Sequence, residues 1–116
     1  MEKRDLINAD GVDAEVLRAY GELYLEAGRF SDALDFFLRA QDPEGLGKIK
    51  ARAIDAADNF LLHRIEGSGL LAVTRDDWRA LADSADRLGK SVVAEIARSR
   101  TQKQSAGSDG VSEEPD

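Results

Sequence analysis

The chain has 116 residues, about the length of one domain. Its 42% apolar residues are enough for one hydrophobic core, and its 34% charged residues are enough for a soluble surface around it. The net charge of −7 makes long-range attraction to phosphates weak, so a nucleic-acid partner is not expected. No apolar run approaches the roughly 20 residues of a membrane span and the start of the chain lacks a signal-peptide pattern, so we expect a cytoplasmic protein without membrane contact.

The first predicted helical hairpin spans about residues 14–41 and follows a lead segment, residues 1–12. Asp13 is the expected N-cap of a helix about four turns long, and Gly28 supplies the left-handed conformation that ends it. Ser31 is then expected to cap the second helix. The apolar residues of the first helix recur at three- and four-residue spacing and predict one packed face. They are Val16, Leu17, Tyr20, Leu23, Tyr24 and Ala27.

The second hairpin is predicted over about residues 43–66. Asp42 is the expected N-cap, and Pro43 is expected at the first helical position. Leu46, Ile49, Ala53, Ala57 and Phe60 follow in helical register. One helix through residue 66 and a break at Asp58-Asn59 are both compatible with this pattern. We favour the break, because these two side chains compete for backbone hydrogen bonds.

The third hairpin is predicted over about residues 75–102. Thr74 and Asp77 have the spacing of a capping box, and Val73 and Trp78 flank it as a hydrophobic staple. A core position is therefore favoured for Trp78 over an exposed partner anchor. Gly89 divides this hairpin into two helices. Residues 103–116 contain no large apolar side chain and are expected to form a disordered acidic tail beyond the helical domain, residues 13–102.

The three predicted corners recur at a near-constant period. Gly28, the Asp58-Asn59 pair and Gly89 lie 30 and 31 residues apart, as in stacked helical arrays. The first hairpin resembles the tetratricopeptide repeat in its small and aromatic residues. The matching positions are Leu17, Tyr20, Gly21, Tyr24, Gly28, Phe30, Ala33, Phe37 and Ala40. The third hairpin matches at Trp78, Leu81, Ala82, Gly89 and Ala94. The resemblance implies an all-α fold, a short right-handed stack of antiparallel hairpins.

The resemblance also implies a binding surface, because the first helices of such hairpins line a groove in which ligand peptides lie. Carried over to this chain, the partner-binding residues are Arg18, Glu22, Lys48, Arg52, Arg79 and Asp83. Lys48 and Arg52 lie one turn apart and could together receive a carboxylate. Alternatively, these are ordinary charges on solvated helix faces.

Catalytic chemistry has little support in the sequence. His63 has no recognisable nucleophile motif beside it, and an oxygen-rich stretch around Gly11 lacks the twelve-residue calcium pattern. The pairs Gly45/Gly47 and Gly67/Gly69 lack the rest of a phosphate loop and are interpreted as helix punctuation. With no cysteine and one histidine, no metal or cofactor is expected. We therefore predict a non-enzymatic module that binds a protein or peptide; the alternative is a self-associating scaffold subunit.

Overall fold

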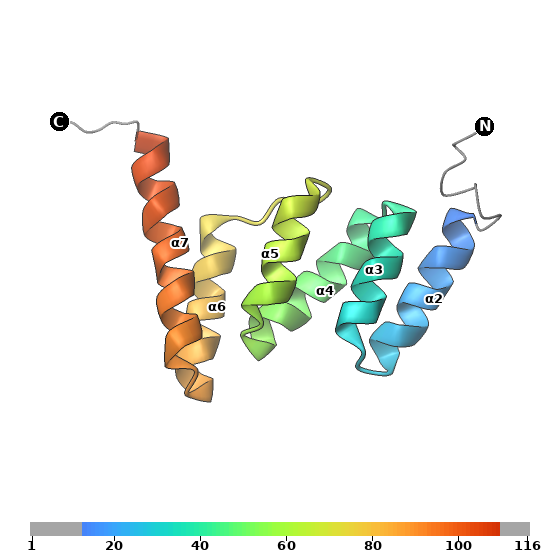
Figure 1. The fold of residues 1–116 in the computed structure, drawn as a ribbon, viewed down its shortest axis with the longest axis horizontal. Helices are drawn as coiled ribbons and strands as arrows, with labels where there is room; N and C mark the ends of the chain where they lie inside the picture. Colours follow the sequence, from blue (N-terminus) through green and yellow to red (C-terminus); the bar gives the residue numbers. More distant parts are fainter. Residues whose placement is uncertain (1–12, 110–116) are drawn as a thin grey trace.

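Within residues 13–109, six helices follow one another in chain order along the long axis of the molecule (Figure 1). The structure is a computed structural model that describes residues 13–109, with side chains through residue 102. Every regular element in that range is helical: α2 (Ala14–Glu26), α3 (Phe30–Ala40), α4 (Pro43–Ala56), α5 (Asn59–Ser68), α6 (Arg75–Leu88) and α7 (Ser91–Asp109). The molecule measures 54 × 32 × 18 Å along its principal axes. The predicted all-α class is confirmed for the residues described.

The same backbone device closes all three predicted corners. Gly28, Ala57 and Gly89 are left-handed, with φ of 79°, 55° and 75°. At each corner the amide that follows donates to a carbonyl five residues back, at 2.9, 2.8 and 2.8 Å, which is the bond of a Schellman motif. The chain therefore turns between α2 and α3, between α4 and α5, and between α6 and α7. The break in the second unit is confirmed, and a single helix through residue 66 is wrong.

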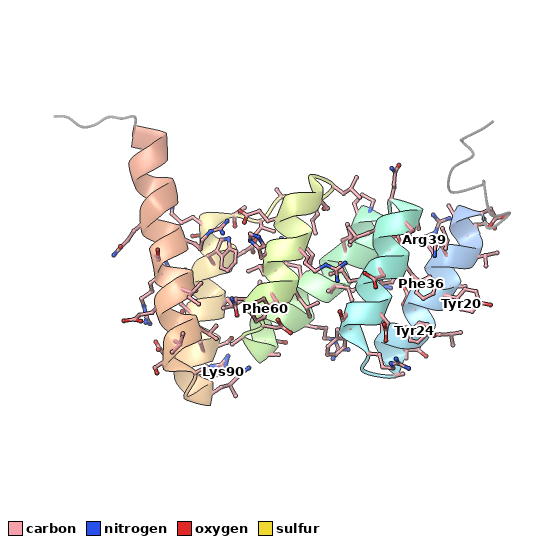
Figure 2. All side chains as sticks on the ribbon, viewed as in Figure 1. Tyr20, Tyr24, Phe36, Arg39, Phe60 and Lys90 are labelled. Atoms are coloured by element: carbon pink, nitrogen blue, oxygen red, sulfur yellow. The ribbon has the colours of Figure 1, made fainter. Side chains whose placement is uncertain are left out.

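The middle corner lies one residue earlier than the predicted repeat alignment placed it. The left-handed residue is Ala57, and Asp58 is the N-cap of α5, where its Oδ1 accepts from the amide of Leu61 at 3.1 Å. This shift places Asn59, not Phe60, at the position equivalent to Phe30. Phe60 consequently leaves the expected packed face and is 77% exposed on α5 (Figure 2).

The predicted helix starts are confirmed at Asp13, Asp42-Pro43 and Thr74 and corrected at Ser31. Asp13 Oδ1 accepts from the amide of Val16 at 3.0 Å, and Thr74 and Asp77 form both bonds of the capping box. Ser31 is not a cap, since α3 already begins at Phe30. Only Arg29 lies between the left-handed Gly28 and the start of α3, so Ser31 falls inside the first turn.

Phe37 of α3 packs closely against both α2 and α4, and so contacts the first two hairpins. It is fully buried, and an added Cβ on Gly21 of α2 would lie 2.6 Å from its ring. An added Cβ on Gly45 of α4 would lie 2.2 Å from the same ring. The predicted close contact at Gly21 is confirmed. Gly45 and Gly47 do not end a helix, because both lie inside α4. Gly67 likewise lies inside the last turn of α5, and only Gly69, its left-handed C-cap, ends that helix as predicted.

The predicted packed face of α2 is only half right. Leu17 is buried, but Val16, Tyr20 and Leu23 are 43%, 47% and 62% exposed. The buried positions continue instead through Gly21 and Leu25. The reason is position in the array: α2 packs against α3 and α4, and its outer side meets no other helix of residues 13–109.

Ion pairs bridge both junctions between successive hairpins, once between first helices and once between second helices. The pairs are Glu22 with Lys48 (2.6 Å), Asp35 with Arg64 (2.6 Å), Lys50 with Asp77 (3.0 Å) and Glu66 with Arg100. The first two pairs are exposed and contribute little to stability, whereas the last two are partly buried. All four connect neighbouring hairpins.

The helical domain does not end at Gln102 as predicted. α7 continues to Asp109, so the first seven residues of the predicted disordered tail are helical. Residues 110–116 and the lead segment 1–12 lie outside the described residues. Among the helices of residues 13–109, none has the combined length and apolar character needed to span a bilayer.

Candidate functional site

The six predicted binding residues lie on the first helices of the hairpins. Arg18 and Glu22 are on α2, Lys48 and Arg52 on α4, and Arg79 and Asp83 on α6. α4 packs against both α2 and α6, so the three helices are neighbours. All six side chains are exposed or half-exposed, and we call this set of residues the mixed-charge face.

Within the mixed-charge face the structure brings Glu22 and Lys48 together across two helices. The Lys48 ammonium donates to Glu22 Oε2 at 2.6 Å, and both side chains are nearly half exposed. This hydrogen bond is the main reason that the pKa of Lys48 lies above its ordinary 10.5. The predicted carboxylate receptor therefore already holds a carboxylate, which belongs to the same chain.

The other predicted residues are not gathered into one site. The Arg52 guanidinium lies over the ring of Phe30, 5.8 Å from its centroid, at the edge between α4 and α3. Arg79 pairs with Asp76 one turn earlier on its own helix, at 2.7 Å. The arrangement is a charged surface several helices wide, without a convergent cluster that could hold a cofactor.

Lys50 makes a junction contact that sequence reasoning missed. Its ammonium bonds Asp77 Oδ2 at 3.0 Å and the carbonyl of Ala72 at 3.3 Å, so α4 holds the capping box that starts α6. Burial of Asp77 acts to raise its pKa, but its bonds to Thr74 and Lys50 outweigh that effect, and the pKa lies below its ordinary 3.8. The capping-box spacing identified Asp77, but nothing in the local sequence indicated Lys50.

Asp77→Asn is expected to lower the free energy of unfolding by about 1 kcal/mol at neutral pH, because the ion pair is lost and the cap weakened. A carboxylate whose pKa falls on folding stabilises the fold above its unfolded pKa, and that stability disappears as the pH drops through the folded value. Urea denaturation of both proteins as a function of pH should therefore give stabilities that converge below pH 3.8.

Asp76→Asn is the matched control for this titration, since Asp76 is exposed and pairs only within its own helix turn. Its stability difference from wild type should be small at every pH. A deficit of Asp77→Asn that stayed constant into acid would contradict the proposed linkage.

A second missed contact holds α7 against α5 and α6. The Arg100 guanidinium lies over the ring of Trp78, 4.7 Å from its centroid, and pairs with Glu66. Trp78 is 1% exposed, so the predicted core role is confirmed. The residue that contacts its ring comes from the last part of the predicted domain, where sequence periodicity gave no reason to select it.

The outer side of α2 carries an apolar surface that the sequence had assigned to the core. We call it the α2 stripe: Val16, Ala19, Tyr20 and Leu23, all exposed. Together with Glu15 they line an open hollow of about 510 Å³. Tyr20 stacks on Phe36 of α3 at 5.4 Å between centroids, and Phe36 stacks on Tyr24 at 5.3 Å (Figure 2).

A second, smaller hollow of about 310 Å³ lies at the opposite end of the molecule, on α6 and α7. Its lining residues are Asp86, Ser91, Val92, Ala94, Glu95 and Arg98. Arg98 is paired with Asp86 across the two helices. None of the six predicted binding residues lines either of these two hollows.

The described residues bring no set of three or more His, Asp or Glu side chains into a metal-binding arrangement. His63 is exposed on α5, one turn after Phe60. Comparison of the chain with protein-family models, with curated proteins and with solved structures finds no match.

Proposed function

We propose that the chain is a non-catalytic protein-interaction module, a short right-handed stack of tetratricopeptide-like hairpins whose mixed-charge face binds a peptide or protein segment. The observation that carries the proposal is the Glu22–Lys48 pair, which joins neighbouring first helices while remaining nearly half exposed. Such a pair contributes about 0–1 kcal/mol, so a partner's charges can replace it at little cost.

A segment with alternating charge would fit this face best. An acidic side chain of the partner could take Lys48 from Glu22, and the released Glu22 carboxylate could then accept a basic side chain of the same segment. Arg52 lies one turn further along α4 and offers a second, bidentate position for an acidic group. The exchange replaces one ion pair within the chain by two with the partner, so binding would be sensitive to salt and to the order of charges in the segment.

The test is affinity capture from the source cell with wild type and with a Lys48→Ala, Arg52→Ala variant. The expected result is a partner that wild type retains and the variant loses by at least about tenfold, or about 1.4 kcal/mol. Arg64→Ala with Arg98→Ala is the matched control. It removes the same charge and also breaks exposed pairs, but on other surfaces.

Equal retention of the partner by wild type and by the Lys48, Arg52 variant would show that the mixed-charge face does not bind the partner. Equal losses in the two double variants would show that only net charge matters. Circular dichroism of each variant confirms that the helices are intact before capture is compared.

A further inference from the structure

The α2 stripe has the spacing of a helix-packing surface, yet no helix of residues 13–109 covers it. Val16, Ala19, Tyr20 and Leu23 stand at positions i, i+3, i+4 and i+7, the pattern by which one helix contacts another. The outer helix of a repeat array usually presents a polar face to solvent. Here the outer helix presents an apolar one.

The shape of the stripe suits the side-chain ridge of an incoming helix. Ala19 is small and stands between the larger Val16, Tyr20 and Leu23, so the surface is hollowed at its middle. The ring of Tyr20 stacks on Phe36, which also stacks on Tyr24. A platform held in this way loses little side-chain entropy when a partner binds.

The charge beside the stripe selects among possible occupants. Glu15 and Glu26 lie at i and i+11 along one edge of the stripe. Glu22 lies between them and is already paired with Lys48, and Arg18 follows at i+3. Glu15 also lines the hollow itself. An occupant with lysine or arginine along the facing edge is therefore complementary, and one with acidic residues there is repelled.

The same charges disfavour a second copy of the chain. A two-fold antiparallel pairing of α2 helices would bring the acidic edge of one copy against the acidic edge of the other, because such an interface joins identical surfaces. The net charge of −7 on each copy adds to this repulsion.

We propose that the α2 stripe docks an amphipathic helix of another protein, with apolar residues at i, i+3, i+4 and i+7 and a lysine- or arginine-rich edge beside Glu15 and Glu26. The site deepens the proposed interaction function by naming a partner class. It does not use the mixed-charge residues Lys48 and Arg52, so the two surfaces can be tested separately.

The probe is a synthetic amphipathic helical peptide of about 18 residues, five turns long, with leucines in the stated pattern and lysines along one edge. A second peptide carries glutamates in place of the lysines. Each is labelled and titrated with the full chain by fluorescence anisotropy. We expect the lysine peptide to bind at least about tenfold more tightly than the glutamate peptide.

Leu23→Glu is the diagnostic variant, and Val92→Glu is its matched control. Both replace an exposed apolar side chain by glutamate, at 62% and 67% exposure, on helices at opposite ends of the molecule. Leu23→Glu should weaken binding of the lysine peptide by at least about tenfold, and Val92→Glu by less than about twofold. Arg52→Ala, which removes a guanidinium that lies over Phe30 of α3, should leave it unchanged, which separates this site from the mixed-charge face.

Four results would overturn the proposal. One is no binding of the lysine peptide to wild type, and another is equal binding to wild type and Leu23→Glu. A third is a wild-type dimer in sedimentation velocity that Leu23→Glu dissociates, which would make a second copy the occupant. The fourth is tighter peptide binding after Leu6→Glu, which would assign the stripe to the chain's own lead segment.

Discussion

Gly21→Leu is expected to lower the free energy of unfolding by about 3 kcal/mol or more and to disorder the first hairpin. The first added carbon alone would lie 2.6 Å from Cε1 of Phe37. Phe37 has little room to move, because Gly45 of α4 also lies against its ring, so closely that an added Cβ there would lie 2.2 Å from Cδ1. The helices α2 and α4 would have to separate, and the junction between the first two hairpins would open.

Urea denaturation followed by far-ultraviolet circular dichroism measures this loss. Gly67→Leu is the control, because Gly67 lies in the last turn of α5 with no atom within 4 Å of an added Cβ. That substitution should be neutral or stabilise by up to about 1 kcal/mol, the helix-propensity difference. A Gly21→Leu protein within about 1 kcal/mol of wild type would show that the contact with Phe37 yields easily.

The helix boundaries that carry a local chemical signal could be predicted from the sequence. The capping box of Thr74 and Asp77, the N-cap at Asp13 and the left-handed glycines at 28 and 89 are all present where expected. Each depends on residues within a few positions of one another. The corner at Ala57 carries no such signal, because alanine usually avoids positive φ, and the alignment drifted by one residue there.

The two sides of α2 could not be separated by periodicity. Leu17 and Val16 are adjacent in sequence and both belong to an apolar pattern, yet one is buried and the other is exposed. Three-and-four spacing indicates that a helix has an apolar side, and on α2 that side is broad enough to reach both the core and the solvent. Only the position of α3 and α4 beside it decides which part is covered.

The contacts of the six candidate residues could not be predicted from the sequence. Arg18 and Glu22 are half-buried on α2, and the other four are exposed on α4 and α6. The pairing of Lys48 with Glu22 joins positions 26 residues apart, and that of Lys50 with Asp77 joins positions 27 apart. Such pairings depend on how neighbouring hairpins cross, which no local pattern encodes.

Trp78→Ala is expected to cost about 3–5 kcal/mol, the range for removing a large aromatic side chain from a packed core. Its ring is fully buried in α6 and also forms the surface against which Arg100 of α7 lies. Truncation leaves a cavity and removes that support, so the Arg100–Glu66 pair loses one of the contacts that position it. Hydrogen exchange should therefore accelerate in α7 more than in α2, which lies at the other end of the molecule.

Trp78→Phe distinguishes the contribution of the aromatic ring to stability from that of the indole nitrogen. Trp78 Nε1 is buried and has no hydrogen-bond partner among the described residues. Phenylalanine removes that unsatisfied donor while keeping an aromatic face for Arg100, so the smaller ring should cost only about 1 kcal/mol. Leu88→Ala is the exposed control on the same helix and should change stability by less than about 0.5 kcal/mol. A loss of stability in Trp78→Phe as large as that in Trp78→Ala would contradict this prediction. It would show that the indole nitrogen itself stabilises the fold.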